Sequence, residues 1–522
     1  KAILKAQVDL LWFGGIGTYI KADDESHFHV GDPANNSVRI DHEQCGAKII
    51  GEGANLAITM PGRIKLSKQG VRLNTDFIDN SAGVNMSDYE VNLKILHKQL
   101  LNDGKFKSKT AVINALFRLT PEVTELTLAN NAQQHRLISE DGARSLHNPF
   151  YFSKFIQQLI IQKAIDSKSL SLLIQSEVKL AIDKKRPLPR PIIAVLQSYA
   201  KMIIAKKLNN SKLISDPFLQ SQYLNYFPKS IQKPHQKVIL NHYLKPEITS
   251  TVLTNHIINQ TGTTFFFEII ELAQSNIETI AKCYLIIEES IALMASKSAV
   301  FNSNVSAHQN QKTIIFIDNQ VKQFVIELLR ISNLNLSFDL IPTLKSHFQK
   351  ITSEKPIQKI IQRSARSWKE KGYNTALSTQ LATLEHLDLI SDILLLHLQT
   401  QYPINKITPF VLFMDSDLKL SLIISKLKRI KPLNITEFDQ INSILQSKQL
   451  LLLRLLEFTY KKVKKETTLN NSIFEATLKQ HAPHAYDRFI VQSKGIKPNS
   501  PLSVQQILSI THSLNTLTLS LS

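Results

Sequence analysis

The sequence predicts an α/β segment at the front of the chain, followed by a long all-α region. Charge separates the two: residues 1–100 carry 11 Lys and Arg against 12 Asp and Glu, while the whole 522-residue chain has a formal net charge of +19. Most of the 15 glycines also lie before residue 105. Short apolar runs bounded by turn residues occupy this front segment, and a helical period of apolar residues follows it.

The front segment has the pattern of a parallel sheet. Between its second and third apolar runs, Thr59 is a candidate N-cap, Pro61 fits a first helical turn and Gly70 is a stop signal. Strand, helix and strand in this order form the repeating unit of a parallel sheet. The predicted strands are 8–13 ("VDLLWF"), 47–52 ("AKIIGE") and 71–78 ("VRLNTDFI").

A helical pattern starts at Ser87 and continues to the end of the chain. Ser87 and Glu90 form a capping box, in which each side chain satisfies a free backbone amide of the other residue. We therefore expect a domain at 1–95 and a helical domain at 96–522, with a subdivision near the proline-rich stretch 184–191. Further predicted helices are 150–166, 170–182, 190–207, 236–260, 266–300, 314–331, 374–402, 417–428 and 436–463.

Composition is that of a soluble globular protein, with 43% hydrophobic and 20% charged residues. Two cysteines cannot build a disulfide framework, which suits a reducing compartment. No apolar run approaches the roughly 18 residues of a spanning helix, and the front has no signal-peptide pattern. We expect a cytoplasmic protein without a membrane partner. Because the chain begins at Lys1 within a helix-like stretch, we also expect it to be part of a longer protein.

The excess of positive charge raises the hypothesis of a nucleic-acid partner. The basic residues, however, are dispersed along amphipathic patterns instead of gathering with aromatic residues. Their densest cluster, 460–466 ("YKKVKKE"), is typical of the solvated face of a helix. We therefore expect no nucleic-acid partner.

Two glycine-containing turns follow predicted strands. "GGIGT" (14–18) either allows a ligand to approach the backbone closely or is a tight structural turn. "GEGAN" (51–55) lies where ligands bind in open parallel sheets, and Asn55 can offer an amide donor and an acceptor or can simply form the turn. Neither spacing matches a known phosphate-binding motif.

The stretch 79–90 ("DNSAGVNMSDYE") joins the third strand to a helix. Asn80, Gly83 and Ser87 lie before a predicted helix N-terminus, where free amides and the helix dipole favour an anion. The simpler interpretation is that Ser87 only caps the helix. Both roles are compatible, because a capping hydroxyl lies at the mouth of such an anion site.

The front histidines raise the hypothesis of a metal site. His27, His29, Asp32, His42 and Cys45 are the candidate ligands, but they lack the close spacing of known metal motifs. We expect them to be loop residues and expect no metal.

The front motifs together resemble a known family. "VDLLWFGGIGTYIKADDESHFHVGDPANNSVRI", "KIIGEGANL" and "RLNTDFIDNSAGVNMSDYEVNLKIL" are similar to the large-subunit, NAD-specific glutamate dehydrogenases of bacteria, and the likeness covers residues 5–96. It continues more loosely at 190–202 and 244–265, so it extends over the helical region.

This resemblance implies a fold, a cofactor and site residues. The fold would be the second half of a doubly wound, Rossmann-like parallel sheet with a helical C-terminal domain. The activity would be oxidation of L-glutamate to 2-oxoglutarate and ammonium with reduction of NAD. By resemblance, Asn55 and Asn80 contact the nicotinamide end of NAD, Gly15 and Gly53 lie beside its ribose, and Ser87 binds the substrate's side-chain carboxylate.

Other parts of that family's site are not found in this sequence. In the family, the catalytic lysines and the glycine-rich phosphate turn precede the matched region. We therefore expect this chain to hold no catalytic residue, to need an N-terminal portion as its partner, and to be inactive alone; the complete enzyme would be a homo-oligomer. The alternative is a non-catalytic helical scaffold or interaction fragment from a split or decaying gene.

Overall fold

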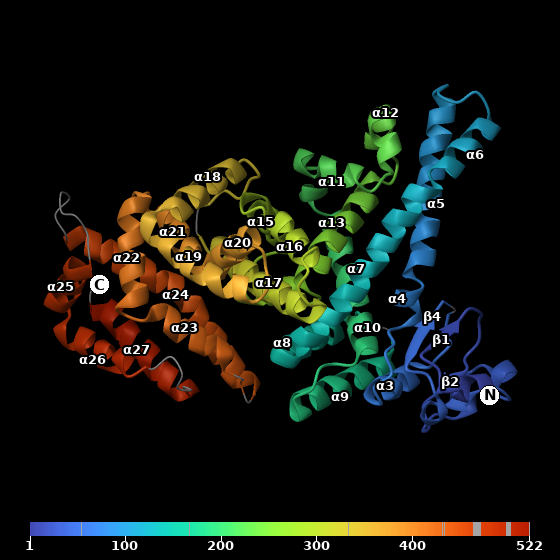
Figure 1. The fold of residues 1–522 in the computed structure, drawn as a ribbon, viewed down its shortest axis with the longest axis horizontal. Helices are drawn as coiled ribbons and strands as arrows, with labels where there is room; N and C mark the ends of the chain where they lie inside the picture. The colour runs from blue at the N-terminus through green and yellow to red at the C-terminus, as the bar shows by residue number, and fades with distance from the viewer. Residues whose placement is uncertain are drawn as a thin grey trace. The chain divides into compact units, whose positions relative to one another are not determined.

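The chain forms two compact units, Lys1–Glu268 and Ile269–Ser522, which are described separately. The computed structural model describes residues 1–53, 55–165, 167–331, 334–430, 432, 434–462, 471–496 and 503–520. Both units are built mainly from α-helices, and the strands lie near the N-terminus in the first unit (Figure 1). The predicted order, an α/β segment followed by an all-α region, is confirmed at this level.

Two small parallel sheets form the front of the first unit. Strand β1 (Leu10–Phe13) pairs in parallel with β4 (Ile49–Glu52), with Leu10 opposite Ile49. Arg72 adds a third position beside β4, because its carbonyl accepts a hydrogen bond from the Ile50 amide at 3.0 Å. Strand β2 (Ile20–Lys21) pairs in parallel with β3 (Ile40–Asp41).

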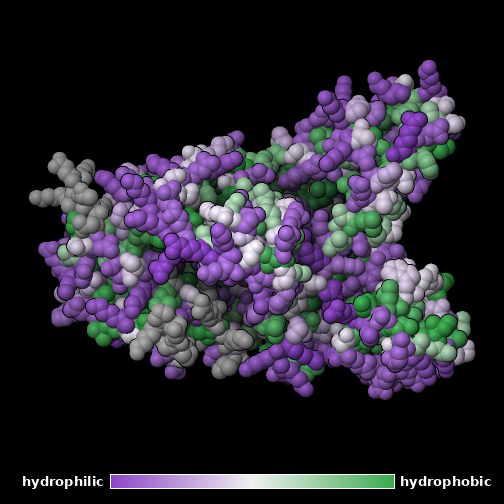
Figure 2. Space-filling view, in the orientation of Figure 1, coloured by the Kyte–Doolittle hydropathy of each residue, from purple (hydrophilic) through white to green (hydrophobic). Residues whose placement is uncertain are grey.

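The main sheet has one buried and one exposed face. Phe13, Ile50 and Leu73 pack on the first unit's core together with residues of helix α3 (Met60–Lys68). Because side chains alternate along a strand, Leu10, Trp12 and Ile49 point to the other face, where the Trp12 side chain is 58% exposed. Apolar side chains are visible over this region at the lower right of Figure 2.

Helix α3 follows its predicted signals closely. The Thr59 hydroxyl accepts a hydrogen bond from the Gly62 amide, Pro61 lies in the first turn, and Gly70 ends the segment with a φ of +94°. The strand predicted at 71–78 is wrong: it is reduced to an isolated bridge at Arg72, and helix α4 occupies Asp76–Asp79. Acidic residues suit a helix N-terminus and disfavour strands, so the second half of that run turns away from the sheet.

Long helices carry the rest of the first unit. Helix α5 packs on α7, and α10 packs on both α7 and α13. The elements are α1 (Ala2–Lys5), α2 (His27–Val30), α5 (Ser81–Asn102), α6 (Lys109–Arg118), α7 (Thr120–His147), α8 (Pro149–Ile161), α9 (Lys168–Lys184), α10 (Arg190–Asn209), α11 (Gln220–Leu224), α12 (Lys229–Leu240) and α13 (Lys245–Thr261), with 3-10 turns at Pro33–Asn35, His42–Gln44, Lys212–Ser215 and Pro217–Leu219. Helix α14 (Phe265–Ala273) contains the division between the two units at residue 268.

The described part of the second unit is helical throughout. Helix α17 packs on α15 and α21, and α24 packs on α21, α25 and α27. The helices are α15 (Ile277–Ser290), α16 (Leu293–Phe301), α17 (Ala307–Leu329), α18 (Leu340–Ser353), α19 (Lys355–Glu370), α20 (Thr375–Glu385), α21 (Leu387–Thr400), α22 (Ile404–Ser416), α23 (Leu420–Arg429), α24 (Ile435–Lys462), α25 (Asn471–His481), α26 (Pro483–Lys494) and α27 (Val504–Ser520).

The long helices predicted at 266–300 and 374–402 are broken in the structure. Asn276 caps α15 through a hydrogen bond from the Thr279 amide, and Ala292 has a φ of +50° between α15 and α16. Each feature ends one helix and starts another, while the apolar pattern runs on across the break.

The predicted domain boundary at residue 95 stays a prediction. Helix α5 runs unbroken through that position, and the two compact units divide at residue 268. The proline-rich stretch 184–191 does separate two helices, since α9 ends at Lys184 and α10 begins at Arg190. None of the helices in the described part of the chain has the length and apolar character needed to cross a lipid bilayer.

Candidate functional site

Three turns meet at the carboxyl edge of the main sheet. They follow β1, β4 and the position of Arg72, and because these segments are parallel neighbours, the turns end on the same side. The first two turns contain Gly15, Gly53 and Asn55; Asn80 lies between helices α4 and α5, next to Asp79, whose carboxylate accepts the Glu52 amide of β4 at 3.0 Å. The structure therefore gathers four of the five predicted site residues at one edge.

The two glycines differ in what surrounds them. Gly15 is exposed, and a Cβ atom built on it would have no neighbour within 4 Å. Gly53 lies under the Trp12 indole, since a Cβ there would come within 2.7 Å of Trp12 Cζ2. The open backbone expected of a ligand-facing glycine is thus present at Gly15, whereas a side chain of the protein fills that space at Gly53.

The turn that carries Asn55 is fixed by two hydrogen bonds of Leu56. Leu56 has a φ of +60°, which is uncommon for a residue with a side chain, and it is 65% exposed. Its amide donates to Asp76 Oδ2 at 2.8 Å, and its carbonyl accepts from the Thr18 hydroxyl at 2.8 Å. Asn55 is exposed on this fixed turn; its neighbour Ala54 lies outside the described residues.

The predicted capping box at Ser87 is wrong. Helix α5 begins at Ser81, and helical hydrogen bonding is in place before Ser87: the Asn80 amide donates to the Asp76 carbonyl at 2.8 Å, and the Val84 amide to the Asn80 carbonyl at 3.3 Å. The Ser81 hydroxyl also accepts a hydrogen bond from Asn131 of α7, which fixes the first turn of α5. The helix N-terminus therefore lies at Asn80.

Ser87 nevertheless shares a helix face with the other residues of that motif. Positions three and four apart are neighbours on a helix, so Asn80, Gly83 and Ser87 lie in one row. The Asn80 side-chain oxygen folds over Gly83, where any Cβ would collide with it. Gly83 and Ser87 are exposed, as are the two valines Val84 and Val91 in the same row. This row runs from the sheet edge along α5.

A buried ion pair lies beneath the edge and was not predicted. Arg63 of α3 donates two hydrogen bonds to the Glu52 carboxylate, at 2.7 and 2.6 Å, and lies 3.2 Å from Asp76 Oδ1. Glu52 is 0% exposed, and burial raises its pKa in spite of the paired guanidinium. The sequence signal was a glutamate at the end of an apolar strand, which requires a partner when it is buried.

A second group of polar residues reaches the edge from distant helices. Arg190, at the start of α10, donates to Asn74 Oδ1 at 2.9 Å and to the Ser139 hydroxyl at 2.8 Å. Asn74 donates to Asp79 Oδ1 at 2.8 Å, and His135 Nε2 of α7 lies 3.3 Å from the same oxygen. Burial lowers the pKa of His135, which favours the neutral ring, although Asp79 opposes this.

This polar group forms one wall of a cavity of about 690 Å³, and the exposed sheet face forms the other. Leu10, Trp12 and Ile49 supply the apolar wall. A pocket with one apolar wall and a few fixed polar groups is typical of a site for an organic ligand. It lies next to the carboxyl edge, because Asn74 and Asp79 belong to both.

The candidate metal ligands have other contacts. His27 Nδ1 lies 2.8 Å from Arg39 Nη1, His29 Nδ1 lies 3.0 Å from the Ser26 hydroxyl, and the Asp32 carboxylate accepts from the Thr18 amide. Over the described ranges, no group of three or more His, Cys, Asp or Glu side chains has a metal-binding arrangement.

Comparison with known proteins agrees with the sheet-edge motifs. Residues 1–141 match the family model described as bacterial NAD-glutamate dehydrogenase, catalytic domain, and residues 185–437 match glutamate dehydrogenase, C-terminal. Relatives named NAD-specific glutamate dehydrogenase include those of Halomonas elongata (33% identity over 293 residues, 56% of this chain), Mycobacterium tuberculosis (36% over 271 residues, 52%) and Pseudomonas aeruginosa (35% over 289 residues, 55%).

The matched segments make up only 18%, 17% and 18% of the lengths of these three relatives, so the chain spans less than a fifth of each. Two consecutive family models and three relatives that carry the same name nonetheless point to the same group of enzymes. Over residues 1–141 and 185–437, the chain is similar to the bacterial NAD-specific glutamate dehydrogenases.

Proposed function

We propose that this chain forms the nicotinamide-side wall of an NAD-dependent glutamate dehydrogenase, which converts L-glutamate, NAD and water to 2-oxoglutarate, ammonium and NADH. The observation that carries this proposal is the meeting of Gly15, Asn55 and Asn80 at one carboxyl edge of a parallel sheet in a chain similar to this family. NAD supplies the hydride acceptor when bound.

The sheet is proposed to be the second half of a doubly wound, Rossmann-like sheet. Its strands are parallel, α3 connects two of its neighbouring positions, and in the described residues β1 pairs with β4 alone. Further strands of the complete enzyme would add beside β1 and cover its free amides. The expectation is slow amide exchange at Leu10 and Trp12, whose N–H groups point away from β4, in the complete enzyme and fast exchange in this chain alone; slow exchange in both would contradict it.

The residues present fit a nicotinamide. Asn55 stands exposed on a fixed turn and can both donate to and accept from a carboxamide, and the space at Gly15 leaves room for a ribose. A ribose contact at Gly53 requires the Trp12 indole to move aside. Trp12 fluorescence tests this, since binding of NAD would change its emission.

Ser87 is proposed to hydrogen-bond the side-chain carboxylate of glutamate from the exposed row on α5. Ser87→Ala in the reassembled enzyme should raise KM for glutamate about tenfold, which corresponds to one hydrogen bond to a charged group, with a smaller effect on kcat. Ser176→Ala on α9 is the control, because that hydroxyl is exposed and bonds only its own helix. An unchanged KM in Ser87→Ala would remove the serine from the site.

We further propose that the chain has no turnover alone, because no general acid or base of the reaction is among its site residues. The decisive experiment mixes the purified chain with the part of a relative that precedes the matched segment and measures glutamate-dependent NADH formation. Activity only in the mixture supports the enzyme. No activity and no NAD binding would favour the non-catalytic scaffold.

The wider setting follows from the family. The complete enzyme is proposed to be a homo-oligomer in the cytoplasm, with glutamate and NAD as its ligands and without a nucleic-acid partner.

A further inference from the structure

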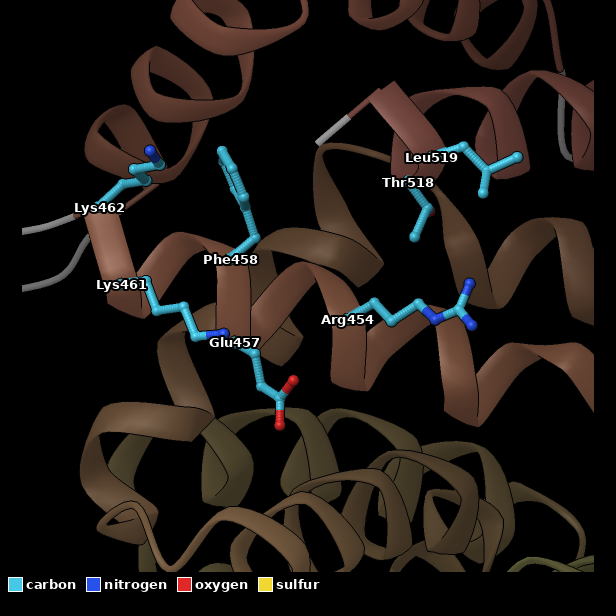
Figure 3. A pocket seen from close by; sticks show the side chains of 7 residues that line it. All are labelled: Arg454, Glu457, Phe458, Lys461, Lys462, Thr518 and Leu519. Carbon is cyan, nitrogen blue, oxygen red and sulfur yellow. The ribbon is translucent and has the colours of Figure 1, made fainter. Parts of the chain in front are cut away.

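A second hollow lies in the helical unit, within Ile269–Ser522. It is formed near the carboxyl ends of α24 and α27, which pack on each other, and it has a volume of about 590 Å³ (Figure 3). Its lining residues are Arg454, Glu457, Phe458, Lys461, Lys462, Thr518 and Leu519.

The lining is strongly cationic on one helix. Arg454, Lys461 and Lys462 stand seven and eight positions apart on α24, which places them on one side of the helix. Glu457 is the single carboxylate of the lining, so the hollow carries three positive charges against one negative charge.

The carboxylate does not neutralise its neighbours. Glu457 is one turn from both Arg454 and Lys461, yet no ion pair joins it to either cation, and the described residues offer neither cation another carboxylate within 4.0 Å. In Figure 3, Glu457 extends to the side of α24 away from Leu519, while Lys462 and Phe458 extend to the other. The positive charge therefore remains available to a ligand.

Apolar side chains complete the hollow. Leu519 is 64% exposed and Phe458 is half-buried, and both line the hollow. The Phe458 ring is held by an edge contact with His481 of α25, with centroids 5.3 Å apart. Cations with adjacent apolar surface suit an anion that has an organic part.

Structural roles alone explain only part of this group of cations on α24. Lysines in the last turn of a helix complement its dipole, which accounts for Lys461 and Lys462. Arg454 lies two turns earlier, where the dipole has little effect, and it has no pairing role among the described residues.

We propose that this hollow is a binding site for a small molecule that carries a phosphate chain. An arginine fork and two lysine ammonium groups are the donors that phosphates select, and the volume lies within the range of about 300–1,000 Å³ typical of small-molecule pockets. The phosphate chain is either inorganic polyphosphate or that of a nucleotide. The site is separate from the proposed dehydrogenase site and does not depend on it.

Calorimetric titration of the full 522-residue chain with tripolyphosphate and with ATP, at low ionic strength, tests the proposal. Arg454→Gln and Lys461→Gln should each weaken binding about tenfold or more, as expected for loss of a charge-assisted hydrogen bond. Lys479→Gln on α25, an exposed lysine outside the hollow, should change it less than about twofold. Tighter binding of ATP identifies a nucleotide; equal binding identifies the phosphate chain alone.

Three results would overturn the site: no binding of either probe, binding that Arg454→Gln and Lys461→Gln leave unchanged, or equal weakening by Lys479→Gln. Circular dichroism melts confirm that the variants fold, and Lys462→Gln replaces any that does not. ATP that binds in the proposed NAD site instead would bind the Arg454→Gln variant as tightly as the native chain. Failure of this hollow as a binding site is therefore distinct from failure of the proposed function.

Discussion

The two units each bury a cation between two carboxylates, but the clusters serve different structures. Beneath the sheet edge, Arg63 pairs with Glu52 and contacts Asp76. Asp76 in turn accepts the Leu56 amide, and Asp79 accepts the Glu52 amide at 3.0 Å. The carboxylates of this cluster therefore hold the turns of the candidate site.

In the helical unit the corresponding cation is Lys448 of α24. Its ammonium lies 2.8 Å from Asp392 of α21 and 3.5 Å from Glu327 of α17, and all three side chains are buried. Although burial lowers it, the two carboxylates raise the pKa of Lys448 above its ordinary value. This cluster joins three helices. Buried charge pairs therefore fix loops in the first unit and helix packing in the second.

Removing the arginine should have the largest effect. Arg63→Met leaves Glu52 and Asp76 buried without a cation, which should cost about 3–5 kcal/mol of stability. The chain has two tryptophans, Trp12 and Trp368, one in each unit, so Trp12 fluorescence in a Trp368→Phe background follows urea unfolding of the first unit alone.

The control for that change lies on the same helix. Lys65 pairs with Asp23 and Asp24 at the surface, so Lys65→Met should cost less than about 1 kcal/mol. Adding Glu52→Leu to Arg63→Met should recover part of the loss, because the stranded charge is removed. Equal losses in Arg63→Met and Lys65→Met would show that the buried pair does not hold the edge.

The corresponding change in the helical unit should cost somewhat less. Lys448→Met removes a single point charge, and the two carboxylates left behind can share one proton, so we expect a loss of about 3 kcal/mol. Trp368 fluorescence in a Trp12→Phe background reports this unit. Lys479→Met is the surface control, and similar unfolding midpoints for the two variants would contradict the role of the cluster.

The helical cluster should also respond to pH. Burial, partly offset by Lys448, raises the pKa of Asp392 from its ordinary value of 3.8 to about 7. A carboxyl whose pKa is raised by folding contributes stability that is fully present below 3.8 and is lost as the pH rises through about 7. Between about pH 5 and about pH 8 the second unit should lose about 2 kcal/mol.

Asp392→Asn isolates that contribution. The variant has no titrating group at this position, so its stability, measured through Trp368, should change less over the same pH range than that of the native chain. Parallel pH profiles would assign the dependence to other groups.

The smallest effects should come from the two glycines of the site. Gly53→Ala places a methyl group 2.7 Å from Trp12 Cζ2 and should displace the exposed indole at a cost of about 1 kcal/mol, with a shift in Trp12 emission. Gly15→Ala meets no atom within 4 Å and should stay within about 0.5 kcal/mol without a shift. A shift in both variants would mean that the turns move together.

Local signals in the sequence predicted the front of the molecule well. The Thr59 cap, Pro61 and the Gly70 stop each act through neighbours within a few residues, and the structure confirms all three. The strands at 10–13 and 49–52 were found for the same reason, since apolar runs between turn residues are local patterns. Where the same apolar pattern crossed a helix break, as at 266–300, it overestimated helix length.

Local sequence signals failed where the structure depends on contacts between residues far apart in the chain. Ser87 and Glu90 have the spacing of a capping box, but contacts of Ser81 with α7 start the helix six residues earlier. Arg190 contacts Asn74 across 116 positions, which no local pattern marks. Glu52 and Arg63 were visible as charged residues, yet their pairing depends on how α3 lies under the sheet.

The sequence by itself determined the order of an α/β segment and an all-α region, the family likeness and the turns that follow β1 and β4, because strand patterns, turn residues and motif wording are local. The tertiary structure alone decided that Gly53 lies under Trp12, that Ser87 stands on an exposed helix face, and that buried charges pair beneath the turns. The physical reason is that burial and pairing are set by elements far apart in the chain, and a buried charge is tolerated only where such an element brings its partner.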